Sequence, residues 1–239
     1  MSYVAVIALL GLVICIHELG HFLAAKAVGL PVARFSLGLG PVVASRRFGR
    51  TRYCLSAIPF GGYVLLDLAG ESDYLRLPLW RRLVFSLAGP AANILFALAC
   101  YMVLYALTPE TAHVPGGFLT RPAAWVLGNV QAILSAIPRL WQHGENVSSL
   151  VGIVAEGGRF VGRSLSRFFL LGGYLSVSLA IFNLLPLPPL DGGKMLFDTL
   201  ERCWGRLARF YVPSSVCGWL ALLALMLYAT VQDVWHYLA

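Results

Sequence analysis

Residues 3–25 read YVAVIALLGLVICIHELGHFLAA, an apolar run that carries three ionisable side chains in its second half. A membrane-spanning helix needs about 20 consecutive apolar residues, so this run is long enough to cross a bilayer. A signal peptide has a shorter apolar core with basic residues before it. We therefore expect these residues to form an uncleaved membrane anchor.

The whole chain shares this apolar character. Its 239 residues are 59% hydrophobic and 12% charged, whereas an ordinary soluble domain has about 25% charged residues. Intrinsic disorder is excluded, because it requires low hydrophobicity and high charge. The net charge of +7 does not indicate nucleic-acid binding, because basic loops beside membrane spans account for it.

Three further apolar runs have the length of a membrane span, at residues 83–107, 168–190 and 210–232. The sequence therefore predicts an all-α membrane protein with four transmembrane helices, in a single domain over residues 1–239. The run from Pro122 to Trp141 is less apolar. Its apolar residues recur at helical spacing, which predicts a helix lying on the membrane surface and leaves a fifth span as the alternative.

Residues 33–66, between the first two spans, have the pattern of a membrane-associated β-hairpin region. Residues 52–58 alternate roughly between apolar and polar, and residues 59–64 supply a turn and a second short strand. We expect arms of about ten residues each. Because these arms are largely apolar, we expect them to lie against the bilayer.

The distribution of Lys and Arg predicts the orientation in the membrane. Thirteen of the 18 basic residues lie within residues 26–82 and 194–209, and five lie within residues 121–167. Cytoplasmic loops carry the excess of Lys and Arg. We therefore predict that both termini are extracytoplasmic, that residues 108–167 form an extracytoplasmic segment, and that the residues between spans one and two face the cytoplasm.

The ionisable residues of the first span are His17, Glu18 and His21. Two histidines four residues apart lie on one face of a helix and can bind the same zinc ion. Glu18 is offset around the helix by about 100° and can reach a metal-held water without being a ligand. Surface histidines give the same spacing by chance, but a charge inside a membrane costs about 2.5–3.5 kcal/mol, which favours a shared ligand.

A zinc site needs a third protein ligand, and Asp191 is the best candidate. It follows Pro186-Leu187-Pro188-Pro189-Leu190 at the end of the third run, and the predicted orientation places it in the same half as the histidines. The prolines break the helix, and Gly192-Gly193 allows the chain to turn. The alternative is that Asp191 only caps a helix that starts near Gly192.

Two asparagines also lie within the apolar runs. Asn93 follows Gly89 by four residues, a spacing that favours close helix packing with an interhelical hydrogen bond. Asn183 precedes Asp191 by about two helical turns, and its position fits a role in the site and a role in packing equally well.

Taken together, these motifs resemble the site-2 proteases, the intramembrane zinc metalloproteases. The resemblance is strongest to the bacterial branch that cleaves membrane-bound anti-sigma factors. Four motifs carry it in the same order along the chain: His17-Glu18-Leu19-Gly20-His21; Phe35-Ser36-Leu37-Gly38-Leu39-Gly40-Pro41 with Ile58-Pro59-Phe60-Gly61-Gly62-Tyr63-Val64; Leu87-Ala88-Gly89-Pro90-Ala91-Ala92-Asn93; and residues 183–193 with Asn183 and Asp191.

The resemblance implies a function and roles for these residues. His17, His21 and Asp191 would bind one Zn²⁺, and Glu18 would be the catalytic base. Asn183, Gly61 and Gly62 would bind the substrate, with the hairpin edge pairing to it as an added strand. The substrate would be a membrane-anchored protein, for example an anti-sigma factor, in the bacterial cytoplasmic membrane, with no nucleic acid involved.

Other functions fit part of the pattern. Bacterial relatives of the anti-sigma type carry PDZ domains between spans two and three, whereas residues 108–167 are too few to hold one, so we expect no PDZ domain here. A membrane metal transporter could use the same histidines and aspartate as a transit site. An inactive relative could bind membrane proteins without cleaving them, although all the expected chemical residues are present.

Overall fold

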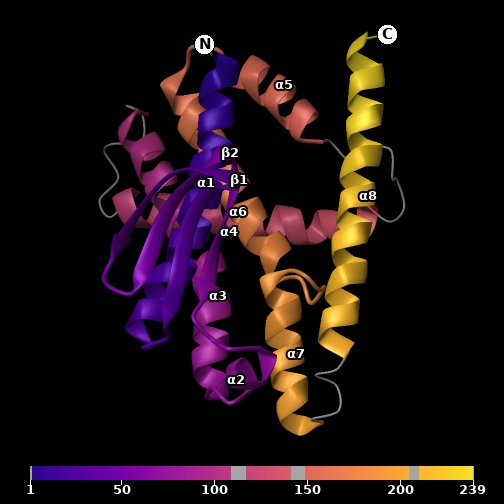
Figure 1. Cartoon of the computed structure of the whole chain (residues 1–239). Coiled ribbons are helices and arrows are strands. Elements are labelled where there is room, and N and C mark those ends of the chain that lie inside the picture. Colours follow the sequence, from indigo (N-terminus) through magenta and orange to yellow (C-terminus); the bar gives the residue numbers. More distant parts are fainter. Residues whose placement is uncertain (1, 109–116, 141–148, 205–209, 239) are drawn as a thin grey trace. The chain divides into compact units, whose positions relative to one another are not determined.

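The computed structural model describes residues 2–108, 117–140, 149–204 and 210–238. Four of its helices are long and apolar enough to cross a membrane (Figure 1): α1 (Ser2–Ala27), α3 (Leu79–Ala106), α6 (Leu165–Leu184) and residues Tyr211–Asp233 of α8 (Tyr211–Leu238). The prediction of four long apolar helices is confirmed. Shorter helices are α2 (Glu71–Leu75), α4 (Gly117–Leu140), α5 (Leu150–Val161) and α7 (Asp191–Cys203).

The third span ends earlier than predicted. We expected it to reach residue 190, but α6 ends at Leu184 and helix resumes only at Asp191. Proline has no backbone N–H and clashes with the preceding turn, so Pro186, Pro188 and Pro189 cannot continue α6. Residues 185–190 therefore form a connection between α6 and α7.

The predicted β region is present and is larger than expected. Strand β1 (Val32–Phe48) and strand β2 (Thr51–Leu66) have 17 and 16 residues and form one antiparallel sheet (Figure 1). The tight turn lies at Gly49 and Arg50, so the turn expected within residues 59–64 is wrong. Those residues belong to β2, which bends where Gly61 adopts a φ of +104°, a conformation that side-chain-bearing residues rarely adopt.

The pairing register leaves two outer segments of this sheet, residues 44–47 and residues 62–66, paired on one side only within the described residues. Phe35 is paired with Tyr53 on one side and with Val64 on the other, and residues 34–37 are an inner segment. Residues 62–66 pair with residues 32–37 alone. This last segment of β2 is therefore an edge strand, and its outer backbone groups are available to another strand.

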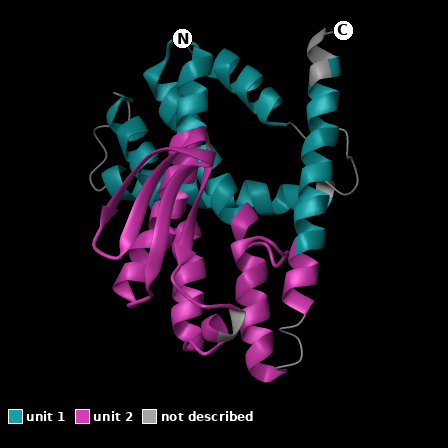
Figure 2. Ribbon diagram, viewed as in Figure 1, with its two compact units in different colours: residues 1–10, 94–181, 216–239 teal, residues 11–93, 182–215 magenta. Residues whose placement is uncertain are grey.

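The chain divides into two compact units (Figure 2), one of residues 11–93 and 182–215, the other of residues 1–10, 94–181 and 216–239. The core of the first unit packs the end of α1 on the sheet, with buried Phe22, Phe35 and Phe85. The core of the second unit joins residues of α3, α4 and α6, with buried Tyr101, Val126 and Val177. The prediction of a single domain over residues 1–239 stays a prediction.

Residues 117–140 form the helix α4, as the spacing of their apolar residues predicted. This helix is not among those that are apolar enough to cross a membrane in the part of the chain that the structure describes. Val126 and Ile133, one face of this helix, are buried in the core of the second unit. The helix predicted from residue 122 onward is thus confirmed as a helix, and its location on the membrane surface stays a prediction.

A buried ion-pair network fixes α7 against α3. The guanidinium of Arg82 in α3 contacts Asp198 and Glu201 of α7, each at 3.1 Å, and its side chain is 2% exposed. Tyr74 of α2 donates a hydrogen bond to Asp198 at 2.9 Å. Because Arg82 and Asp198 are removed from water, either charge would be costly to leave buried without its partner.

We predict that Arg82→Met destabilises the protein by about 3–5 kcal/mol, because the substitution leaves Asp198 buried without its cation. The measurement is unfolding of the purified protein in detergent. Arg76→Met is the matched control, because Arg76 pairs with Asp73 with 82% of its side chain exposed and an exposed pair contributes about 0–1 kcal/mol. Equal effects of the two substitutions would contradict the prediction.

Candidate metal centre

Helix α1 presents His17 and His21 on one face, one turn apart, as the sequence predicted. Both side chains are buried, with 6% exposed, and their ring centroids lie 4.7 Å apart in an edge-to-face arrangement. The Nε2 atoms of the two rings are 3.1 Å apart. Both rings therefore turn their Nε2 atoms toward the same point.

Asp191 completes a triangle of ligand atoms. Its Oδ2 atom lies 3.1 Å from Nε2 of His17 and 3.1 Å from Nε2 of His21. Among the described residues, these three side chains are the group whose geometry suits a metal ion. The alternative role of Asp191 as a helix cap is not observed, because Leu190 occupies the N-cap position of α7 and Asp191 is its first helical residue.

The triangle fits a zinc ion. Three ligand atoms that lie 3.1 Å from one another are close enough to hold one zinc ion at the usual ligand distances of about 2.0–2.1 Å. Three is also the number of protein ligands in catalytic zinc sites, which keep a further position for water or substrate. A set of two imidazoles and one carboxylate also suits zinc chemically.

The two imidazoles favour the ionised form of the Asp191 carboxylate. Burial alone would raise the pKa of Asp191, but the neighbouring imidazoles of His17 and His21 outweigh that effect and hold this pKa below its usual value. The ionised form is the one that binds a metal.

The backbone of α3 orients the ring of His21. Nδ1 of His21 donates a hydrogen bond to the carbonyl of Phe85 at 2.7 Å. With the proton on Nδ1, the lone pair of Nε2 faces the metal position. Phe85 thus selects the tautomer that a metal ligand requires, and the motif His17–His21 alone gives no signal of it.

Asn93 plays the corresponding part for His17. The sequence favoured a packing role for Asn93, but its side-chain amide lies 3.3 Å from Nδ1 of His17 and is fully buried. When Nε2 binds a metal, Nδ1 carries the proton and needs an acceptor. The amide nitrogen of Asn93 faces Nδ1 in the structure. The oxygen and nitrogen of an amide exchange places when it is turned by 180°, so the amide oxygen would be that acceptor in the metal-bound protein.

Two glycines allow the histidines to approach α3. A Cβ atom on Gly89 would lie 2.4 Å from Nε2 of His21 and 2.8 Å from Cε1 of His17. A Cβ atom on Gly20 would lie 2.4 Å from the carbonyl oxygen of Ala88. The sequence indicated close packing at Gly89, but it did not show that the packed partners are the metal ligands themselves.

The glycines after Asp191 have a different role from the expected turn. Gly192 and Gly193 lie in the first turn of α7 and are buried. A Cβ atom on Gly192 would lie 2.2 Å from the carbonyl oxygen of Leu184, and one on Gly193 would lie 2.4 Å from the carbonyl carbon of Leu187. They allow residues 184–187 to pack on the start of α7, which holds Asp191 in place.

Glu18 lies against the sheet. A Cβ atom on Gly62 would lie 2.8 Å from Cγ of Glu18. The side chain of Glu18 therefore lies against residues 62–66 of β2 at Gly62, the residue of that segment that has no side chain. Gly61, the other predicted substrate-binding glycine, is the bend of β2. Asn183 lies half-buried in the last turn of α6, and its role stays a prediction.

Comparison with known proteins agrees with this site. Residues 5–227 match Peptidase family M50. A Chlamydia trachomatis protein is 40% identical over 113 residues, which cover 40% of this chain and 18% of that protein. Proteins of Campylobacter jejuni and a Nostoc species are 23% and 25% identical over 98% of this chain, covering 93% and 96% of their own lengths. All three names include the words "Putative zinc metalloprotease".

The fold and the site thus define a membrane-type metallopeptidase with a His-Glu-x-x-His helix and a distant aspartate. The chain belongs to Peptidase family M50, the site-2 protease family. Its enzyme class is that of the zinc metalloproteases.

We predict that Asn93→Ala weakens zinc binding by about 10- to 100-fold, the usual effect of losing the outer partner of a ligating histidine. Competition with a chelator for the metal of the purified protein measures this affinity. Asn93→Asp keeps an acceptor for Nδ1 of His17 and should retain most of the affinity. Unchanged zinc binding in Asn93→Ala would show that the amide does not support His17.

We also predict that Gly89→Ala abolishes stoichiometric zinc binding, because the added methyl group occupies the space of the two imidazoles. Metal content of the purified protein is the measurement. Gly128→Ala is the matched control, because Gly128 also lies inside a helix, α4, and a Cβ atom there meets nothing within 4 Å. Full zinc occupancy in Gly89→Ala would refute the close contact between α3 and the histidines.

Proposed function

We propose that this protein is an intramembrane zinc endopeptidase. It hydrolyses a peptide bond in or near the transmembrane segment of a membrane-anchored protein. The observation that supports this most is the convergence of three ligand atoms from α1 and α7 within 3.1 Å of one another, beside a carboxylate that is not part of the triangle.

The protein's own residues supply the binding and the proton transfer. His17, His21 and Asp191 would hold one zinc ion. A bound zinc ion makes a water more acidic and polarises the carbonyl of the bond to be cleaved. Glu18 is the base that takes the proton from the attacking water and delivers it to the leaving amine. Phe85 keeps His21 in the required tautomer, and Asn93 would do the same for His17 with its amide oxygen turned toward Nδ1.

The edge of β2 is suited to hold the substrate. A transmembrane helix hides its amides within its own hydrogen bonds, so a segment must unwind before it can be cut. An unwound segment can add to a free sheet edge as a new strand. Residues 62–66 form such an edge, and Gly62 places it against Glu18. The roles of Gly61, Gly62 and Asn183 in substrate binding belong to this proposal.

Exposed apolar side chains support a location within the bilayer. On α8, Trp219, Leu220 and Leu227 are 63%, 64% and 60% exposed, and on the sheet Val43 and Phe48 are 70% and 78% exposed. Lipid is the solvent in which such surfaces are stable. We propose the bacterial cytoplasmic membrane, with both termini extracytoplasmic and the site toward the cytoplasm, and a membrane-anchored regulator such as an anti-sigma factor as substrate.

A metal transporter would use the same ligands without needing a base. Glu18 distinguishes the two functions, because it stands beside the triangle and is not one of its ligands. An inactive binding protein would have no need for the ligand triangle. The geometry therefore favours the peptidase over both alternatives.

We predict that Glu18→Gln lowers cleavage of a single-span substrate by about 100- to 10,000-fold, the usual contribution of a general base, while zinc remains bound. Cleavage in detergent and metal content are measured on the same preparation. A chelator should abolish cleavage by the unsubstituted protein, and added zinc should restore it. Cleavage retained in Glu18→Gln would exclude Glu18 as the base.

A further inference from the structure

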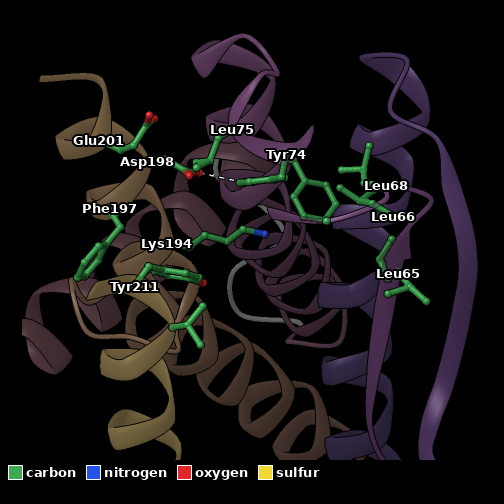
Figure 3. Close-up of a pocket in the computed structure, with 14 residues that line it drawn as sticks. Leu65, Leu66, Leu68, Tyr74, Leu75, Lys194, Phe197, Asp198, Glu201 and Tyr211 are labelled. Carbon is green, nitrogen blue, oxygen red and sulfur yellow. Dashed lines mark hydrogen bonds between the residues drawn. The ribbon is translucent and has the colours of Figure 1, made fainter. Parts of the chain in front are cut away.

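A cavity of about 410 Å³ lies beside the metal centre within the same compact unit (Figure 3). Its walls come from the end of β2, from α2 and α7, and from the start of α8. Most of the lining side chains are apolar or aromatic, among them Leu66, Leu68, Phe197 and Tyr211. The mechanism described above makes no use of this cavity.

Phe85 joins the cavity to the metal centre. Its carbonyl orients His21, and its ring lies 5.2 Å from the ring of His21 and 4.7 Å from Nζ of Lys194, which lines the cavity. The ammonium is therefore no farther from the imidazole than the sum of these distances, about 10 Å. An extended peptide covers this distance in about three residues.

The substrate-binding edge leads into the cavity. Gly62 contacts Glu18, and the next residues of the same edge, Val64, Leu65 and Leu66, line the cavity. A strand rises about 3.3 Å per residue. A substrate strand paired to this edge would therefore reach the cavity about two to four residues away from the bond beside Glu18.

The polar groups that line the cavity determine which polar atoms of a ligand it can bind. The carboxylate of Asp198 is already engaged by Tyr74 and Arg82. Lys194 extends from α7 toward the ring of Tyr74 (Figure 3), with Nζ 5.0 Å from the ring centroid. Aromatic rings flank this ammonium, and the carboxylates of Asp198 and Asp191 attract it, but among the described residues none accepts a hydrogen bond from it. It can therefore donate to an oxygen of a bound ligand.

We propose that this cavity is a specificity pocket for one large apolar side chain of the substrate, two to four residues from the cleaved bond, with Lys194 bonding to a main-chain carbonyl of the same segment. This inference rests on the proposed function. The unwound transmembrane segment supplies both features, because its side chains are apolar and its carbonyls have lost their helical partners.

The test is cleavage of a single-span substrate series by the full-length protein in detergent. Leu is exchanged for Ala at each of the second to fourth positions on either side of the cleaved bond. We expect one position at which Ala lowers kcat/KM by about 10-fold or more, the discrimination typical of an apolar enzyme pocket. Leu68→Trp fills the cavity and should bring the Leu-to-Ala ratio at that position to within about twofold.

Leu55→Trp is the matched control, because Leu55 is 54% exposed and does not line the cavity; it should keep the preference. Phe197→Ala enlarges the cavity and should shift the preference from Leu toward Trp. Lys194→Met should lower kcat/KM of the zinc-loaded protein for the whole series by a similar factor, since a main-chain contact does not depend on the side chain.

Two results would overturn the inference while leaving the peptidase intact. One is cleavage with no preferred position in the series. The other is a preference that Leu68→Trp and Phe197→Ala both leave unchanged, as expected if a lipid chain occupies the cavity. Failure of the unsubstituted, zinc-loaded protein to cleave any substrate would instead count against the proposed function.

Discussion

The metal centre depends on the close contact of α1 with α3. Helix α1 supplies both imidazoles, but α3 supplies the space for them at Gly89, the carbonyl of Phe85 for one ring and the amide of Asn93 for the other. Because Gly20 packs on the backbone of α3 at Ala88, the two helices are too close for a larger residue at either glycine. The positions of the two histidine ligands thus depend on the packing of α1 against α3.

Helix α7 is held at both ends of its buried face. At its start, residues 184–187 pack against Gly192 and Gly193 and fix Asp191. Two turns later along α7, Asp198 forms an ion pair with Arg82 of α3. Since α3 thereby contacts both the histidines and α7, it is the common support of all three ligands. A catalytic ion needs this rigidity, because loosely held ligands cannot enforce an open coordination position.

The sequence predicted correctly those features that depend on residues close together in the chain. The spacing of His17 and His21, the proline-broken helix before Asp191 and the four long apolar runs each rest on residues close in the chain, and their predictions agree with the structure. The turn expected within residues 59–64 was wrong because glycine and proline favour both turns and strand bends. The tight turn at Gly49 and Arg50 lies in a stretch of basic residues with little β pattern.

Contacts between residues far apart in the chain could not be predicted from the sequence pattern. The hydrogen bond of Asn93 to His17 joins residues 76 positions apart, and an asparagine in a helix gives the same local pattern whether it packs or supports a ligand. Arg82 was counted as a cytoplasmic loop charge in the orientation argument, yet its side chain is buried at 2% exposure. Charge counting cannot separate a loop arginine from one that forms a buried ion pair.

One short helix carries three separate tasks, which constrains any redesign of this molecule. Asp191, Lys194 and Asp198 recur along α7 at intervals of three and four residues, and so lie near one another on its surface. A substitution on that surface meant to reshape the cavity would also disturb the ligand or the ion pair. Altered selectivity is more safely sought from the opposite wall, at Leu68 after β2, where a new side chain leaves the anchoring of α7 untouched.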